Sequence, residues 1–169
     1  MIRFATFAAA AVMALAAPAA ASPAPAPVQA ATAPGVSIEA VRAWLTSKGG
    51  TVSETIRRDG ETWISIDDGP MTWVIFFYGC EADICGDIQY AASFSNPTIT
   101  QTMVNDWNRD RRFLKAFLTP GEPGGDQTAV VQYDVLIGEG GVEQLTDPTA
   151  LWLQLLSAFA TTVGYLAAE

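Results

Sequence analysis

The chain has 169 residues, with 9 basic and 18 acidic side chains, a formal net charge of −9 at pH 7 and no histidine. This charge repels phosphate backbones and anionic membrane surfaces, which argues against nucleic-acid binding. The missing histidine removes the usual general base of nucleophilic catalysis and the commonest metal ligand. We therefore expect a non-enzymatic protein that uses neither a metal nor another cofactor.

The first 35 residues differ in composition from the rest of the chain. Residues 1–21 contain one basic residue, Arg3, and a short apolar run that ends in small residues. This pattern is typical of a cleaved secretory signal peptide, and it predicts a periplasmic or secreted protein with no membrane insertion after cleavage. Residues 22–35 are uncharged and rich in proline and alanine, which predicts a disordered linker. Residues 36–169 then have a common size for one domain.

The first half of this domain shows one helix pattern followed by strand patterns. Ser37 is a candidate N-cap of a helix that ends near Gly50. Residues 51–79 predict three strands joined by turns that contain Asp-Gly. The third of these, at residues 73–78, is apolar at every position, which predicts a central strand buried on both sides. Residues 87–94 alternate between apolar and polar side chains and predict a fourth strand.

Cys80 and Cys85 are the two cysteines of the chain. A closely spaced pair in an exported protein predicts a disulfide, here between two strands. Because the closed loop is short, we expect a stabilisation of about 2–3 kcal/mol at most. Metal binding and redox catalysis are the alternatives, but there is no second cysteine pair and the spacing is not C-x-x-C.

The second half predicts a helix, a hairpin and a closing helix. Thr98 and Gln101 have capping-box spacing at the start of the first helix. Residues 112–119 and 128–137 predict the two hairpin strands. The closing helix has Asp147 as its expected N-cap. Its predicted buried side consists of Leu151, Leu155, Ala158 and Phe159. The order helix, four strands, helix, two strands, helix predicts an α+β domain with a mainly antiparallel sheet and flanking helices.

This order of elements resembles that of YbjN-domain proteins. The residues that carry the resemblance are FYGC at 77–80, VNDWNRDRRF at 104–113, FLKAFL at 113–118 and YDVLIGEGGV at 133–142. The family is described as a sensory-transduction regulator, and its fold is similar to that of type III secretion chaperones. The resemblance implies a partner-binding role without a defined activity, and it leaves homodimerisation open. The export pattern and the cysteine pair depart from cytosolic members, so we transfer no regulatory role from them.

The stretch VNDWNRDRRF has two interpretations. In the first, Arg109, Arg111 and Arg112 end a helix and complement its dipole, each by about 0.3–1 kcal/mol. Trp107 then belongs to the core, and Asn108 satisfies backbone groups where helix gives way to strand. In the second, the three arginines together with Asn108 form a cationic island that binds a carboxylate of a ligand or partner chain.

Two functional hypotheses follow. The first is an exported, non-enzymatic binding or chaperone-like, regulatory module that docks a protein or peptide partner. It predicts an exposed apolar patch or an accessible sheet edge. The alternative is a carboxylate-based hydrolase acting on an envelope glycan, which requires two carboxylates about 5–10 Å apart in a cleft. Asp67 and Asp68 are expected in a turn, whereas Asp134 is expected to face either an arginine across the sheet or water.

Overall fold

A computed structural model of the protein describes residues 34–119 and 125–167. The predicted signal peptide and residues 22–33 of the predicted linker lie outside these residues. The compact unit Thr32–Glu169 holds the whole hydrophobic core, whose members lie between Val36 and Leu166. Within the described part of the chain, no helix has the length and apolar character that crossing a bilayer requires.

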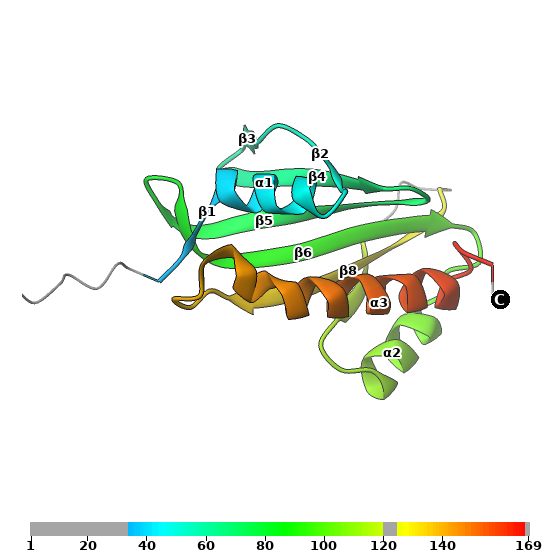
Figure 1. Cartoon of the computed structure of the whole chain (residues 1–169). Helices are drawn as coiled ribbons and strands as arrows, with labels where there is room; N and C mark the ends of the chain where they lie inside the picture. Colours follow the sequence, from blue (N-terminus) through cyan, green and yellow to red (C-terminus); the bar gives the residue numbers. More distant parts are fainter. Residues whose placement is uncertain (1–33, 120–124, 168–169) are drawn as a thin grey trace, which may run out of the picture. The chain divides into compact units, whose positions relative to one another are not determined.

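The domain is an α+β fold built on an antiparallel sheet, as predicted (Figure 1). The strands are β1 (Val36–Ser37), β2 (Thr51–Val52), β3 (Ile56–Arg58), β4 (Glu61–Asp68), β5 (Met71–Glu81), β6 (Ile84–Asn96), β7 (Lys115–Thr119) and β8 (Gln127–Leu136). The helices are α1 (Ile38–Ser47), α2 (Gln101–Asp110) and α3 (Thr146–Thr162), with a 3-10 helix η1 at Gly141–Leu145. The main path across the sheet is β2-β4-β5-β6-β8-β7, while β1 pairs with β6 and β3 pairs with β4. The first predicted strand is therefore divided into β2 and β3, and β1 and η1 are additional elements.

The two predicted Asp-Gly turns differ in outcome. Between β3 and β4 the loop residues are Asp59 and Gly60, both with positive φ, as the hairpin chemistry of Asp-Gly predicts. Between β4 and β5, Asp68 still pairs with Met71, so the loop consists of the next two residues. Asp67 and Asp68 are therefore exposed at the end of β4 rather than inside the turn.

Cys80 and Cys85 form a disulfide at the tip of the hairpin between β5 and β6. The two residues lie directly opposite each other in the antiparallel register. The loop beyond them has Ala82 and Asp83 at φ 47° and 67°, the left-handed region that two-residue hairpin loops require. The cross-link therefore holds closed a turn whose residues are not the glycine and asparagine that favour it.

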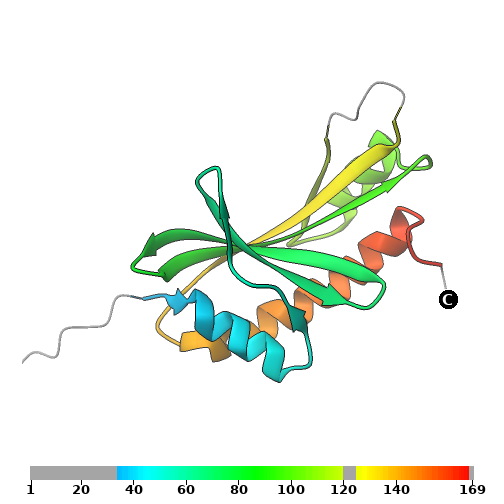
Figure 2. The same ribbon diagram turned by 90° about the horizontal axis from the view of Figure 1, so that it is seen from above.

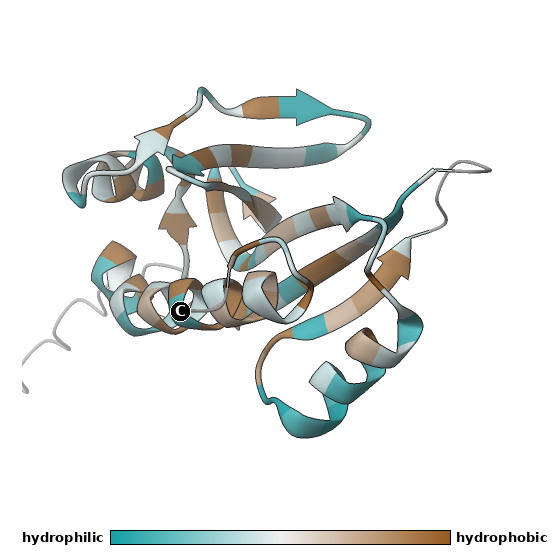
Figure 3. Ribbon diagram, turned by 90° about the vertical axis from the view of Figure 1, so that its right-hand side faces the viewer, coloured by the Kyte–Doolittle hydropathy of each residue, from teal (hydrophilic) through white to brown (hydrophobic). Residues whose placement is uncertain are grey.

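Three helices cover one face of the sheet. α1 and α3 lie on the same side of the strands (Figure 2). The central strand β5 directs Trp73, Ile75 and Phe77 to this side, where all three are buried. α2 is mainly hydrophilic (Figure 3), and it inserts Val104 and Trp107 into the core.

The helix starts differ from the predicted ones at two places. The N-cap of α2 is Thr100, whose hydroxyl accepts a backbone hydrogen bond of 3.3 Å. Thr98 lies in the preceding turn, where its amide donates to the Asn96 side chain at 2.8 Å. The N-cap of α3 is Leu145, because η1 runs directly into the helix. Asp147 consequently lies in the first turn, where its charge still complements the helix dipole.

The buried side of α3 is rotated from the predicted one. Of the predicted set Phe159 is buried, whereas Leu151, Leu155 and Ala158 are only partly so. The helix is apolar around most of its circumference, so periodicity does not determine which stripe faces the sheet. Aromatic packing does: the Trp152 ring lies 5.6 Å from that of Tyr90 on β6. The buried residues of α3 are Thr149, Trp152, Leu156, Phe159 and Ala160.

The prediction that β5 is buried on both sides is wrong for one side. Val74 and Phe76 point away from α1 and α3 and are only half-buried, and Tyr78 is 41% exposed. Apolar residues on both faces of a strand predict two covering layers, but the described helices pack on one face. The other face of the sheet is therefore an uncovered surface.

Candidate functional site

The arginine-rich stretch at the end of α2 is engaged in local contacts. Arg109 forms ion pairs of 2.6 Å with Asp106 and 2.7 Å with Asp110. The hydrogen bond from Arg109 lowers the pKa of Asp110, and the two carboxylates raise the pKa of Arg109. Two carboxylates thus already neutralise the Arg109 guanidinium, which makes it a weak anchor for a third.

Asn108 and Trp107 connect α2 to the strand that follows it. The Asn108 side chain donates to the Ala116 carbonyl at 2.8 Å and accepts from the Ala116 amide at 2.9 Å. The Trp107 indole donates to the Leu114 carbonyl at 3.3 Å. β7 is the edge of the main sheet, so Asn108 takes the place of a further strand on its outer side. This is the structural role that the sequence suggested for both residues.

Arg111 and Arg112 lie beyond the last turn of α2 and are exposed. The Arg111 guanidinium stands 5.7 Å from the Trp107 ring, and that of Arg112 stands 4.9 Å from the Phe113 ring. Neither residue forms an ion pair within the described part of the chain. That these residues contact a partner stays a prediction.

The second candidate site is the uncovered side of the sheet, which we call the open face and which is larger than the arginine-rich stretch of α2. It consists of the side chains on β4 to β8 that point away from α1 and α3, at every second position. Its apolar members come from neighbouring strands in register: Val74 of β5 pairs with Ala91 of β6, and Phe117 of β7 pairs with Val130 of β8. Phe117 is 40% exposed, which is unusual for an aromatic side chain on a sheet.

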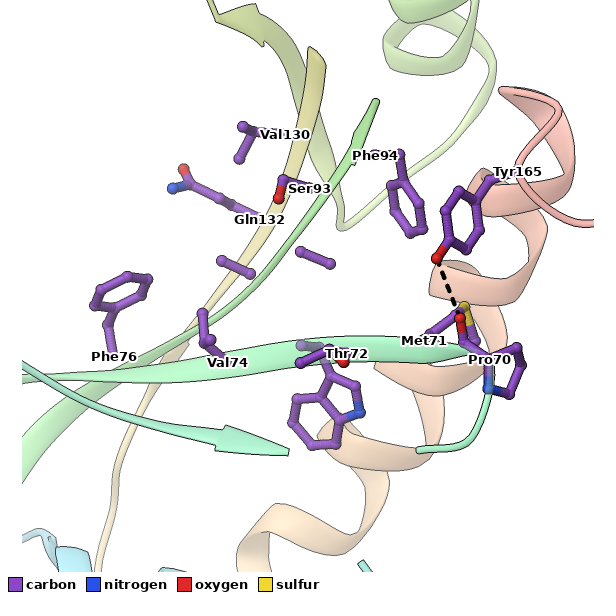
Figure 4. Close-up of a pocket in the computed structure, with 13 residues that line it drawn as sticks. Pro70, Met71, Thr72, Val74, Phe76, Ser93, Phe94, Val130, Gln132 and Tyr165 are labelled. Atoms are coloured by element: carbon purple, nitrogen blue, oxygen red, sulfur yellow. Dashed lines mark hydrogen bonds between the residues drawn. The ribbon is translucent and has the colours of Figure 1, made fainter. Parts of the chain in front are cut away.

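One end of the open face contains a hollow of about 490 Å³ (Figure 4). The strand side chains that line it are all uncharged, and they include Thr72, Val74, Phe76, Ala91, Ser93, Val130 and Gln132. Tyr165, which follows α3, closes one end by donating a hydrogen bond of 3.3 Å to the Pro70 carbonyl. An uncharged hollow on a strongly acidic chain is suited to apolar side chains of a ligand.

Aromatic side chains form a row beside this hollow. The Trp63 ring lies 5.8 Å from that of Phe76, and the Phe76 ring lies 6.4 Å from that of Tyr78. The Arg58 guanidinium stands 5.6 Å from the Trp63 ring. Aromatic rings that remain partly exposed in this way are common anchors of protein interfaces.

The other end of the open face is acidic. Tyr78, Asp87, Asp134 and Leu136 line a smaller hollow of about 240 Å³. Burial, and secondarily the charges of Glu61 and Asp134, raise the pKa of Tyr78. Asp134 faces neither an arginine nor water alone: it accepts a hydrogen bond from Gln89 and forms an ion pair of 3.1 Å with Lys115.

The hydrolase hypothesis requires two available carboxylates in a cleft, and of the two that line the smaller hollow, Asp87 and Asp134, one is already engaged. Asp134 is already held by Gln89 and Lys115, and Asp67 and Asp68 are exposed at a strand end. Across residues 34–119 and 125–167, no group of three or more histidine, cysteine, aspartate or glutamate side chains could hold a metal ion. What the arrangement offers is a surface for binding: an uncharged, apolar end, a row of aromatic rings and an acidic end.

The sequence did not identify the open face, although it contained the signal. Val74, Phe76 and Tyr78 alternate with the three buried residues of β5, so their apolar character was visible. Such a run predicts burial under a second layer, because periodicity reports hydrophobicity and not what covers it.

Comparison with known proteins identifies the family. The model of the YbjN family, described as "Putative bacterial sensory transduction regulator", matches residues 37–164. A solved structure described as "Crystal structure of YbjN, a putative transcription regulator from E. coli" aligns at 15% identity over 75% of this chain and 87% of that chain, with a TM-score of 0.45. No match is found among curated proteins. Because the family model spans most of its length, this chain belongs to the YbjN family.

Proposed function

We propose that this chain is an exported, non-enzymatic binding module, chaperone-like or regulatory, whose open face docks a protein or peptide partner. The observation that carries the proposal is the uncharged hollow of about 490 Å³ with half-exposed apolar side chains around it. Uncovered apolar surface in contact with water costs free energy, and its retention is typical of an interaction site.

Two further observations support this proposal. The family description as a sensory-transduction regulator fits a module that acts by binding. The N-terminal pattern of residues 1–21 favours export, and the disulfide between Cys80 and Cys85 fits an oxidising compartment such as the periplasm.

The test is an affinity pull-down from the envelope extract of the native bacterium. A variant with Phe76→Asp and Val130→Asp places two charges on the open face, and we expect it to lose the partner that the wild type retains. A variant with Ala43→Asp and Ala150→Asp, at exposed helix positions, is the matched control for added charge and should retain the partner.

The Arg109→Ala, Arg112→Ala variant tests the cationic island in the same extract. Retention by the open-face variant, with its fold verified by circular dichroism, would refute the proposal.

A further inference from the structure

The polarity of the open face changes along its length. The β6 residues Ser93, Ala91, Gln89 and Asp87 occupy successive positions of this face. Six residue steps along a strand span roughly 20 Å. Over that distance the surface passes from the uncharged hollow to the hollow that contains Asp87 and Asp134. A ligand that covers both ends must therefore be extended. Its side chains must be apolar at the uncharged end and cationic at the acidic end.

The acidic end has the chemistry of a site for a cationic side chain. Asp87 is half-buried and forms no ion pair with any of the described residues. Tyr78 and Leu136, which are 41% and 85% exposed, stand on either side of it as paired residues of the neighbouring strands. A lysine or arginine has an apolar stem for these two walls and a cationic head for the carboxylate.

The charges around this end add up to a negative site. Glu61, Asp87 and Asp134 surround Tyr78, and the pKa of Tyr78 is raised in part by Glu61 and Asp134. Lys115 pairs with Asp134, and Arg58 lies opposite Glu61 in the register of β3 and β4, so the three carboxylates and these two cations leave a net negative charge. An acidic partner segment would be repelled here, whereas a basic one is attracted.

The opposite end selects apolar side chains. Val74, Phe76 and Val130 present carbon surface, while Ser93 and Gln132 offer polar groups that can satisfy a peptide backbone. An extended chain directs alternate side chains to one side, so every second residue of such a ligand would enter the hollow.

Building on the proposed function, we infer that the partner presents an extended segment with apolar residues at alternate positions, followed by a lysine or arginine. The apolar residues occupy the hollow beside Phe76, and the basic residue lies between Tyr78 and Leu136 against Asp87. Charge complementarity with the acidic end sets the direction in which the segment runs along β6, between β5 and β8.

A display library of random 12-residue peptides tests this inference on the protein without residues 1–33, which retains every core residue. We expect enrichment of peptides with alternating apolar residues followed by Lys or Arg. For an enriched peptide, Asp87→Asn should raise the Kd about threefold to tenfold, since the carboxylate is partly solvated. Changing the peptide's basic residue to Gln should raise the Kd for the wild-type protein by the same factor. For the Asp87→Asn protein this change in the peptide should leave the Kd unaltered, because the carboxylate is already absent. Glu143→Gln, which removes an exposed charge from η1, should leave the Kd within about twofold.

The outcomes separate this inference from the function on which it rests. Enriched peptides that lack a basic residue, or that bind the Asp87→Asn protein as tightly as the wild type, would overturn the inference. If Phe76→Ser still abolishes their binding, the open face remains a docking surface. Peptides that bind regardless of Phe76→Ser would overturn both. Sedimentation velocity tests a further outcome. If the wild type is a dimer and Phe76→Ser is a monomer, a second copy of the chain occupies the open face, and the inference is overturned.

Discussion

At the scale of single residues, Asn108 shows how a polar side chain can complete a sheet. An edge strand leaves backbone groups on its outer side without strand partners. Asn108 bonds both the amide and the carbonyl of Ala116, because an asparagine amide carries its donor and its acceptor on separate atoms. Of the two roles that the sequence allowed for Asn108, the structure shows the structural one, a support of β7.

We expect Asn108→Ala to lower the free energy of unfolding by about 1–3 kcal/mol, because it removes both partners of Ala116. Urea denaturation followed by circular dichroism measures this change. Asn105→Ala is the control: Asn105 is exposed on the same helix, and among the described residues its side chain accepts a hydrogen bond only from Gln101, so its loss should cost at most about 0.5 kcal/mol. Equal losses in the two variants would contradict the support role.

Tyr90 makes stability depend on alkaline pH. Its buried hydroxyl lies 2.7 Å from that of Thr149, and burial raises the pKa of Tyr90 to about 12, whereas an unfolded tyrosine titrates near about 10. Between these values the unfolded chain has lost a proton that the folded chain keeps. The contribution of protonated Tyr90 to the free energy of unfolding is therefore complete below about pH 10. That free energy falls by about 2–3 kcal/mol as the pH rises from about 10 to about 12.

Urea titrations at several pH values between 9 and 12 measure this fall. Tyr90→Phe removes the ionisable group, so its stability should decline less over the same range. Parallel curves for wild type and variant would show that Tyr90 is not the group responsible.

At the scale of elements, α3 illustrates what a uniformly apolar helix leaves undetermined. Its predicted and observed buried sides share Phe159, and they differ because the helix is rotated about its axis. The hydrophobic effect favours burial of any apolar stripe by a similar amount. The shape of the partner surface then selects one stripe, here the one with Trp152, whose ring packs near those of Trp73 and Tyr90.

Two neighbouring leucines of α3 measure this rotation. Leu156 is fully buried and Leu155 is only partly so. We expect Leu156→Ala to destabilise the protein by about 2–5 kcal/mol, and Leu155→Ala to cost clearly less, because less surface and no closed cavity are involved. Thermal or urea unfolding measures the loss of stability in each variant relative to the wild type. A larger loss for Leu155→Ala would return the helix to its predicted orientation.

At the scale of the whole molecule, the acidic surface and the open face have complementary roles in the proposed function. A chain with a net charge of −9 stays soluble and repels other acidic surfaces. Its open face, in contrast, has an uncharged hollow. Contact with a partner is thereby directed to one surface of the domain.

Export itself has a direct test. We expect the mature protein recovered from the envelope or the medium to begin at Ser22, because residues 1–21 have the pattern of a cleaved signal peptide. N-terminal sequencing or intact mass spectrometry measures this. Replacing Ala19 and Ala21 with Arg, which removes the small residues before the cleavage point, should block processing. A cytoplasmic product that still carries Met1 in the wild type would contradict the export proposal.

The sequence by itself determined the α+β class, the order of the principal elements and the hairpin at Asp59-Gly60. These features depend on residues within one or two turns of each other, so local patterns report them. Only the tertiary structure decided the rotation of α3 and the exposure of Phe76 and Tyr78. Each depends on which distant segment packs against it, and hydrophobicity alone does not specify that segment. The open face is the clearest case: its residues are apolar enough for a core, but the helices cover the other side of the sheet.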